Sequence, residues 1–482
     1  MMTERAFRTT DELLAQADGI LRIEGDGVEI LDINALRGHY VDRLVWSVVF
    51  GDEDLKQQSR WLIRQVAEVA GAWTASIQDL YMAAGRGAYA NATTPAINLR
   101  AMAYDTARAV FQAAEATGTK QMIFELARSE MGYTQQRPAE YASVVLGAAI
   151  REGWEGPVFI QGDHYQTSLK AWASDPAAEF TAVRNLAVEA IQAGYGNIDI
   201  DTSTLVDVSR PDLAEQQRAN YVQTAALTAA IRAAEPDGIT ISIGGEIGEV
   251  GTTNSTVEDL DAFMEGYQAE LNRLSQEAGR DLAGISKISV QTGTSHGGIV
   301  LPDGSIKEVA VDFETLGALS RVARERYGLG GAVQHGASTL PESAFDRFAS
   351  VNAVEVHLAT AFQNAIFDSP YFPQELTDEI HAYLDANHAD ERSDGQTDAQ
   401  FYYTARKRAI GPFKRQLWML DDERKLGILE HLQSRFAMIM QQLGVAGLSE
   451  IVDRHVPRVA FPIVIPDGSV PLTNVDLGDE GE

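Results

Sequence analysis

The stretch VFIQGDH, residues 158–164, decides the fold of this chain. Its first three residues are β-branched or aromatic, as in a strand that is buried on both faces. Gly162 ends this apolar run, and two ionisable residues, Asp163 and His164, follow at once. A short buried strand that ends in a glycine and reactive side chains is typical of a parallel sheet whose carboxyl edge carries a site.

Seven further runs of this kind lie along the chain, and each is followed by an amphipathic stretch suited to a helix. The eight predicted strands are 96–98, 121–125, 158–161, 197–201, 239–243, 285–291, 331–334 and 353–358. The clearest predicted helices are 104–117, 177–193, 215–234 and 256–276, the last with a capping signal at Thr256 and Asp259. Eight strand and helix units in about 270 residues predict an α/β fold, a (β/α)8 TIM barrel. The alternative, an open doubly wound sheet, does not require eight units, and no GxGxxG motif follows the first strand.

Helical periodicity dominates on both sides of these units. Residues 1–90 show it without convincing strands, and a connection with small residues and a proline follows at 85–95. After residue 370 the pattern is helical again, and the last residues are acidic. The sequence therefore predicts a helical N-terminal extension at 1–90, the barrel at 91–370, and a C-terminal helical extension with an acidic tail at 371–482.

Composition and charge exclude several classes of partner and chemistry. The chain has 482 residues, with 39 Lys and Arg against 69 Asp and Glu, so its formal net charge is −30. Such a surface repels phosphate backbones and anionic headgroups, so we expect neither nucleic acid nor membrane partners. There is no cysteine, which excludes thiolate chemistry and leaves His, Asp and Glu as metal ligands. The charged N-terminus lacks an apolar signal region, so we expect a cytoplasmic protein.

Polar residues gather at the ends of six predicted strands, where catalysis in a barrel takes place. These ends read GDH at 162–164, DIDTS at 199–203, GGE at 244–246, TGTSHGG at 292–298, HGAS at 335–338 and HLAT at 357–360. Three of their histidines, His164, His296 and His335, lie beside Asp or Gly. Three imidazoles with an open fourth position are a catalytic zinc arrangement, although any one of these histidines alone would also suit a hydrogen-bonding role.

Taken together over residues 95–420, these motifs resemble the class II metal-dependent ketose-bisphosphate aldolases, which have fructose and tagatose bisphosphate members. The resemblance implies His164, His296 and His335 as Zn²⁺ ligands and Asp163 as the acid/base on a substrate hydroxyl. It implies reversible retro-aldol cleavage of a ketose phosphate such as fructose 1,6-bisphosphate to dihydroxyacetone phosphate and an aldehyde. That chemistry needs an electrophile at the ketose carbonyl and a base at the hydroxyl, which these residues and the metal would supply.

Two acidic residues near the predicted metal have open roles. Glu246 and Asp201 are candidates to orient a ligand histidine, to bind the metal in an alternative position or to contact substrate. The alternative is that they cap the following helix or pair with an arginine.

Substrate and phosphate contacts are expected at further strand ends. Glycines let backbone N–H groups approach an anion, and hydroxyls add donors, although glycines at strand ends are also common as plain turns. The candidates are Asn98, Gly297, Gly336, Ser338, His357 and Thr360.

The chain departs from the family pattern in two places. The last predicted strand reads EVHLATA at 355–361 where the family has Lys-x-Asn-x-x-Thr-Asp/Glu, so an Asn that contacts the enediolate oxygen is replaced. This puts the identity of the substrate in doubt. In the loop after the fifth strand the acidic residues lie four positions later, so Glu258 is either the proton donor to the enediolate or only the start of a helix.

The basic helix around 401–415 bears on whether the chain forms an oligomer. In the family a C-terminal arginine reaches a neighbour's site to hold the distal phosphate, and Arg406 or Arg408 is suited to that role. A salt-bridged face toward the acidic N-terminal helices is the alternative. A homo-oligomer, a dimer or a tetramer, follows by analogy.

Three other functions remain to be weighed. Parts of the chain resemble the non-catalytic companion subunit of tagatose-bisphosphate aldolase, but such companions lack a histidine at the position of His296. Another metal-dependent sugar-phosphate lyase or isomerase is the second alternative. A Schiff-base mechanism is disfavoured because Lys287 opens its predicted strand and so lies at the wrong end of the barrel.

Overall fold

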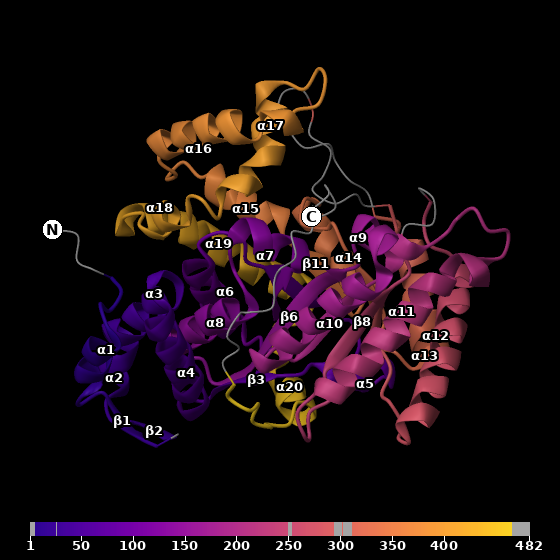
Figure 1. Cartoon of the computed structure of the whole chain (residues 1–482), viewed down its shortest axis with the longest axis horizontal. Coiled ribbons are helices and arrows are strands. Elements are labelled where there is room, and N and C mark those ends of the chain that lie inside the picture. The colour runs from indigo at the N-terminus through magenta and orange to yellow at the C-terminus, as the bar shows by residue number, and fades with distance from the viewer. Residues whose placement is uncertain (1–4, 26, 249–252, 294–300, 302–310, 465–482) are drawn as a thin grey trace.

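The computed structural model describes residues 5–25, 27–248, 253–293, 301 and 311–464. Eight parallel strands pair in sequence, and the last pairs with the first, so that the sheet closes into a barrel. The strands are β4 (Thr94–Asn98), β5 (Ile123–Ala127), β6 (Gly156–Gln166), β7 (Asn197–Asp201), β8 (Ser242–Glu246), β9 (Lys287–Ser289), β10 (Ala332–Gln334) and β11 (Glu355–Leu358). The predicted (β/α)8 barrel is confirmed, and each of the eight predicted strands is present. Figure 1 shows three of them, β6, β8 and β11, with helices around them.

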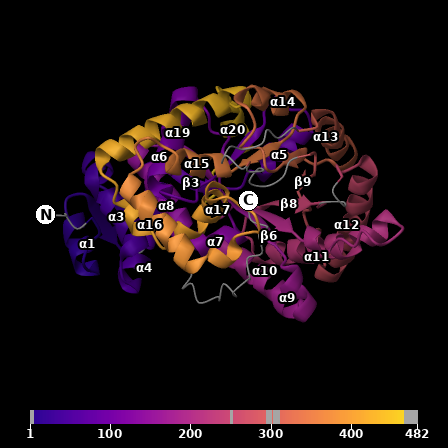
Figure 2. The same cartoon turned by 90° about the horizontal axis from the view of Figure 1, so that it is seen from above.

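Helices surround this barrel. They are α6 (Ala103–Thr117), α7 (Arg128–Thr134), α8 (Pro138–Glu152), α9 (Leu169–Ser174), α10 (Pro176–Gln192), α11 (Leu213–Ala234), α12 (Val257–Ala278), α13 (Phe313–Tyr327), α14 (Phe345–Ser350) and α15 (Thr360–Phe367). Figure 2, seen from above, shows α10 to α13 ranged around β6, β8 and β9. The predicted cap of α12 is confirmed, because Asp259 accepts from the Thr256 N–H at 2.9 Å and donates its own N–H to Thr256 Oγ1 at 3.2 Å.

The N-terminal segment contains strands that the sequence analysis did not predict. Its helices are α1 (Thr10–Ala17), α2 (Ile33–Ala35), α3 (Val41–Phe50), α4 (Glu53–Ala70) and α5 (Gln78–Gly85). Strands β1 (Leu21–Glu24) and β2 (Gly27–Ile30) form an antiparallel hairpin, and β3 (Ala72–Ala75) joins the main sheet. The alternation of apolar and charged residues at 21–24 and 28–30, with glycines at 25 and 27 between them, is a hairpin signal that the sequence analysis overlooked.

Strand β3 lies against the lower half of β6. It pairs with β6 from Gly156 to Phe159, whereas β7 pairs with β6 only from Gln161 onward. The next residues are tied to the barrel as well, since Ile77 N donates to Asn197 Oδ1 at 2.9 Å and Ser242 N donates to Ser76 Oγ at 3.1 Å. The N-terminal segment is therefore part of the lower rim of the barrel.

The C-terminal helices are α16 (Gln374–Asn387), α17 (Asp398–Ala405), α18 (Lys414–Trp418), α19 (Asp422–Gln442) and α20 (Ser449–His455). Helix α19 packs along α6 and contacts α15, while α3 and α4 pack against α8. In the part of the chain that the structure describes, no helix combines the length and the hydrophobicity needed to cross a bilayer.

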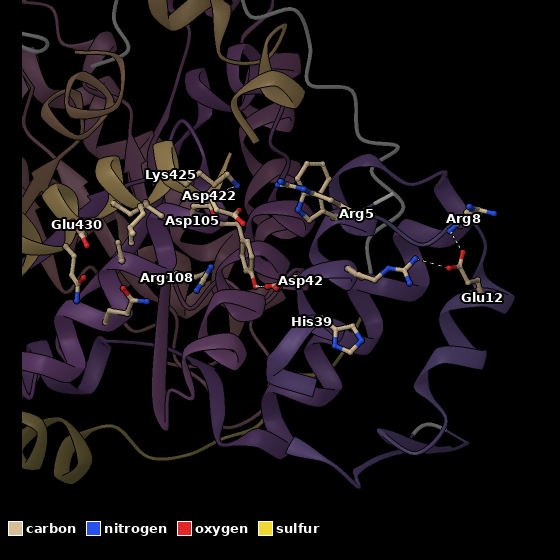
Figure 3. Close-up of a pocket in the computed structure, with 18 residues that line it drawn as sticks. Arg5, Arg8, Glu12, His39, Asp42, Asp105, Arg108, Asp422, Lys425 and Glu430 are labelled. Carbon is tan, nitrogen blue, oxygen red and sulfur yellow. Dashed lines mark hydrogen bonds and ion pairs between the residues drawn. The ribbon is translucent and has the colours of Figure 1, made fainter. Parts of the chain in front are cut away.

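A cleft of about 850 Å³ lies where the N-terminal helices meet α6 and α19 (Figure 3). Polar and charged side chains in this cleft make contacts between segments that are far apart in the sequence. Lys425 Nζ lies 2.5 Å from Asp105 Oδ2, and the Tyr104 hydroxyl donates to Asp42 Oδ1 at 2.6 Å. These contacts join the N-terminal and C-terminal helices to the barrel wall.

Candidate active site

A backbone irregularity directs Asp163 and His164 to the same site. Consecutive residues of a regular strand point to opposite faces of the sheet. In β6 the register to β7 shifts between Gly162 and Tyr165, and His164 has a φ of +37°, which is rare for a residue other than glycine. As a result His164 Nε2 lies 3.7 Å from Asp163 Oδ1, and both side chains face the barrel mouth.

His164, Glu246 and His335 form a candidate metal site. Their ligand atoms lie within 4.8 Å of one another, and the two imidazole centroids are 4.2 Å apart. His164 Nδ1 lies 3.2 Å from Glu246 Oε2, and Ser289 Oγ lies 2.8 Å from His335 Nε2. Two imidazoles and a carboxylate are a ligand set that Zn²⁺ accepts, so these residues fit a divalent cation. The predicted ligand His296 lies outside the described residues.

Carboxylates surround His164 and create a field that favours positive charge. Burial lowers the pKa of His164, but Asp163 and Glu246, together with hydrogen bonds to Asp201 and Glu246, raise it more, so that this pKa lies well above its ordinary value. The same field favours a divalent cation in place of that proton.

Asp201 supports His164 from the side. Its Oδ2 lies 3.3 Å from His164 Nδ1 and accepts from Gln166 Nε2 at 2.8 Å, while Oδ1 accepts from Ser203 N at 3.0 Å and Ser203 Oγ at 2.6 Å. Burial raises the pKa of Asp201, but the hydrogen bonds with His164 and Ser203 lower it more, so the pKa lies below its ordinary value. Of the predicted roles for Asp201, this geometry suits the orientation of a ligand histidine.

The side chain of Asp163 is ionised, and its carboxylate oxygens can accept further hydrogen bonds. It is fully buried, and its Oδ1 lies 3.1 Å from His357 Nδ1. Burial raises its pKa, but the positive charges of His164 and His357 lower it more, to about 2. Apart from this close contact with His357, neither carboxylate oxygen has a hydrogen-bond partner among the described residues. An ionised carboxylate in this state can take a proton from a substrate hydroxyl.

Below Asp163 the barrel interior holds a layer of charged side chains. His357 Nε2 lies 2.6 Å from Glu355 Oε1, and the Glu355 carboxylate also pairs with the Lys287 ammonium. Lys287 Nζ in turn donates to Asp199 Oδ2 at 2.9 Å and to Gln161 Oε1 at 2.8 Å. This layer was missed in the sequence, where the signal was the presence of ionisable residues within β7, β9 and β11.

Lys287 is unsuited to form a Schiff base for two reasons. It lies at the start of β9, and its amine is held in the protonated form. Burial lowers its pKa, but the carboxylates of Asp199 and Glu355 raise it more, so the pKa lies above its ordinary value. A nucleophilic amine must be unprotonated, whereas this one is held as an ammonium ion.

Three residues expected to contact substrate are engaged elsewhere in the protein. His357 is buried and its Nδ1 lies 3.1 Å from Asp163 Oδ1, so its ring contacts the predicted base. Asn98 is buried and donates through Nδ2 to Glu130 Oε2 at 2.6 Å. Arg406 Nη1 lies 2.5 Å from Asp368 Oδ1 at the end of α15, and not against the N-terminal helices of the predicted alternative.

The expected phosphate contacts lie on the loops after β10 and β11. Gly336 has a φ of +66°, which a glycine adopts without strain. Ser338 Oγ accepts from Ala361 N at 3.3 Å, and Thr360 Oγ1 lies 3.5 Å from Arg100 Nη1. Gly297 lies outside the described residues. Glu258 is exposed in the first turn of α12, as expected if it only starts that helix.

The fold and this site define a (β/α)8 barrel protein with a candidate metal centre at the mouth of the barrel. The family model described as "Fructose-bisphosphate aldolase class-II" matches residues 75–408. The chain belongs to this class II aldolase family. A search of curated proteins finds no match to the chain.

Solved structures with the same fold carry several names. The native structure of fructuronate-tagaturonate epimerase UxaE from Cohnella laeviribosi is 10% identical, with 91% of each chain covered and a TM-score of 0.52. A probable tagatose 6 phosphate kinase from Sinorhizobium meliloti 1021 is 16% identical, with 75% of this chain and 100% of that chain covered and a TM-score of 0.52. A fructose-bisphosphate aldolase from Campylobacter jejuni is 16% identical, with 78% and 96% covered and a TM-score of 0.44. The likeness to the first two structures, at these identities, shows the fold alone.

Proposed function

We propose that this protein is a zinc-dependent class II aldolase that cleaves a ketose (bis)phosphate, such as fructose 1,6-bisphosphate, to dihydroxyacetone phosphate and an aldehyde. One observation carries the proposal: the group formed by His164, Glu246 and His335 lies directly beside the ionised carboxylate of Asp163. His296 is proposed as a further metal ligand from its position in the sequence motif. The metal would act as a Lewis acid on the ketose carbonyl.

In this proposal Asp163 carries out the proton transfer at the C4 hydroxyl of the substrate. Asp163 accepts the proton of the C4 hydroxyl, the C3–C4 bond breaks, and C4 becomes the carbonyl carbon of the aldehyde. The electron pair of the broken bond stays with C3 in the enediolate, which takes up a proton at C3 to give dihydroxyacetone phosphate. Backbone N–H groups around Gly297 and Gly336 and the hydroxyls of Ser338 and Thr360 are proposed to hold the phosphate.

A second candidate function is epimerisation of a ketose or keto acid. It is favoured by the epimerase structure, whose likeness extends over 91% of this chain and therefore beyond the barrel. The chemistry is related, because retro-aldol cleavage followed by addition to the other face of the retained aldehyde gives the epimer. This reaction would use Asp163 and the metal in the same way.

The direct test is retro-aldol cleavage of fructose and tagatose 1,6-bisphosphates in a triose-phosphate-coupled assay, with and without a chelator. We expect cleavage that the chelator abolishes and Zn²⁺ restores. Conversion of a sugar acid to its C4 epimer, followed by NMR and without release of triose, would favour the second candidate. Zinc-loaded protein that turns over neither class would favour the non-catalytic companion.

We also propose that the protein forms a homo-oligomer. Light scattering would measure its molar mass in solution.

A further inference from the structure

We propose that His357 is a positioning residue that fixes the Asp163 carboxylate at the barrel mouth, and that Glu355 and Lys287 hold the His357 ring. The inference rests on the proposed function in one respect, namely that Asp163 is the base. It also gives a role to the unusual sequence of β11, where Glu355 and His357 stand in place of the residues that the class II aldolase motif has there.

The His357 ring has a hydrogen bond at Nε2 and two carboxylates within ion-pair distance of Nδ1. Nδ1 lies 3.1 Å from Asp163 Oδ1 and 3.1 Å from Glu125 Oε2, and Nε2 lies 2.6 Å from Glu355 Oε1. The side chain is fully buried, so no water competes for these contacts. A ring fixed at both edges has one orientation, and that orientation determines where the Asp163 carboxylate lies.

Glu355 is fixed in turn from three sides. Its carboxylate pairs with the Lys287 ammonium, accepts from the Tyr81 hydroxyl, and accepts from Gln161 Nε2 at 2.9 Å. The chain of contacts thus runs from Lys287 through Glu355 and His357 to Asp163, entirely inside the barrel.

Stability alone does not explain this layer. Branched apolar side chains usually fill the interior of such a barrel. Buried charges are costly unless paired, and an apolar layer of similar volume is often as stable or more so. The charges are accounted for if the layer holds the catalytic carboxylate in position, as supporting residues do in other preorganised sites.

A competing role for His357 is support of the metal, because its ring centroid lies 4.0 Å from that of His335. The two roles differ in what they disturb. Loss of a support for His335 weakens Zn²⁺ binding, whereas loss of a support for Asp163 slows proton transfer and leaves Zn²⁺ affinity and KM unchanged.

The test compares His357→Asn with His357→Gln. The amide of Asn reaches the position of Nδ1 and can still donate to Asp163, whereas the amide of Gln reaches the position of Nε2, toward Glu355. We expect kcat to fall by about 100-fold in His357→Gln and by no more than about 10-fold in His357→Asn, with KM unchanged. His388→Asn, on a distant surface turn, is the matched control, and thermal unfolding confirms that each variant is folded.

A double-mutant cycle shows whether His357 acts through Asp163. In the Asp163→Asn background, His357→Gln should have no further effect on kcat, because the group that it positions is already gone. An additive loss, equal losses in the Asn and Gln variants, or a loss of Zn²⁺ affinity that matches the loss of kcat would overturn the proposal.

Crystal structures of the wild type and both variants keep this test independent of the proposed function. We expect the Asp163 carboxylate to keep its place in His357→Asn and to rotate away in His357→Gln. An unmoved carboxylate in His357→Gln overturns the positioning role even if the enzyme is active. A wild-type protein without aldolase or epimerase turnover overturns the proposed function and leaves the crystallographic result to decide the positioning role.

Discussion

The Asp201 carboxylate lies 3.3 Å from His164 Nδ1 while accepting three further hydrogen bonds from Gln166 and Ser203. Asp201 is therefore a fixed support for the imidazole that we propose as a zinc ligand. Such carboxylate–histidine contacts set the tautomer and the orientation of a ligand ring.

Replacement of Asp201 by Ala is expected to weaken Zn²⁺ binding about 10–100-fold, because His164 loses its orientation. Isothermal titration calorimetry on metal-stripped protein measures this. Asp207→Ala, an acidic residue on the surface that pairs with Ser209 and Arg210, is the matched control and should leave the affinity unchanged. Equal affinities in wild type and Asp201→Ala would show that the contact does not support the metal.

Glu125 makes folding stability depend on pH. Burial and the charge of Asp163 raise its pKa to about 8, despite the opposing effect of His357. Since the unfolded pKa is about 4.3, the folded state binds the extra proton, and this contribution to stability is lost as the pH rises toward 8. The free energy of unfolding of the wild type should therefore fall relative to that of Glu125→Gln as the pH rises from about 5 to about 8. Urea unfolding across this range measures the difference, and a constant difference would contradict the assignment.

The buried pair in the cleft of Figure 3 gives a prediction about stability. Lys425 and Asp105 are only 11% and 7% exposed, so Lys425→Met leaves a buried carboxylate unpaired and should cost about 3 kcal/mol. The double variant with Asp105→Asn should recover most of the loss. Lys56→Met, which breaks a pair with an exposed Glu53, should cost less than about 1 kcal/mol. Urea unfolding compares these variants, and equal costs in Lys425→Met and Lys56→Met would be inconsistent with the burial of the first pair.

Arg406 is expected to contribute little to substrate binding. Its guanidinium is occupied by Asp368 and by Asn364, whose Oδ1 lies 2.5 Å from Arg406 Nη2. Arg406→Ala should change KM for a ketose bisphosphate less than about 3-fold, since rim contacts of this kind rarely carry binding energy. Steady-state kinetics at constant ionic strength measures it, with Arg408→Ala alongside. An increase in KM of about 10-fold or more would indicate that Arg406 leaves Asp368 to hold a phosphate.

The alternation of apolar runs and helices was sufficient to predict the barrel and its strand ends, because both depend on local sequence. The level of each side chain inside the barrel was not predictable in this way. His357 and Glu355 are two residues apart on β11 and so share a face, but their depth depends on the stagger between neighbouring strands. That stagger comes from long-range pairing, so the sequence did not show that His357 would contact both Asp163 and Glu355.

The site itself was predictable as a set of residues but not as a geometry. The motif with Asp163 and His164 indicated metal chemistry, yet regular strand geometry would have placed their side chains on opposite faces. The irregularity at Gly162 to Tyr165 that brings them together follows from packing against β7.

Strand β3 covers backbone groups of β6 that would otherwise form an open edge at the lower rim of the barrel. A chain shortened to begin after residue 77 would expose that edge, together with the side chain of Asn197 and the N–H of Ser242 that Ile77 and Ser76 now satisfy. Unpaired strand edges recruit other strands, so the shortened barrel would be prone to aggregate. We therefore expect the first seventy-seven residues to limit the aggregation of the barrel.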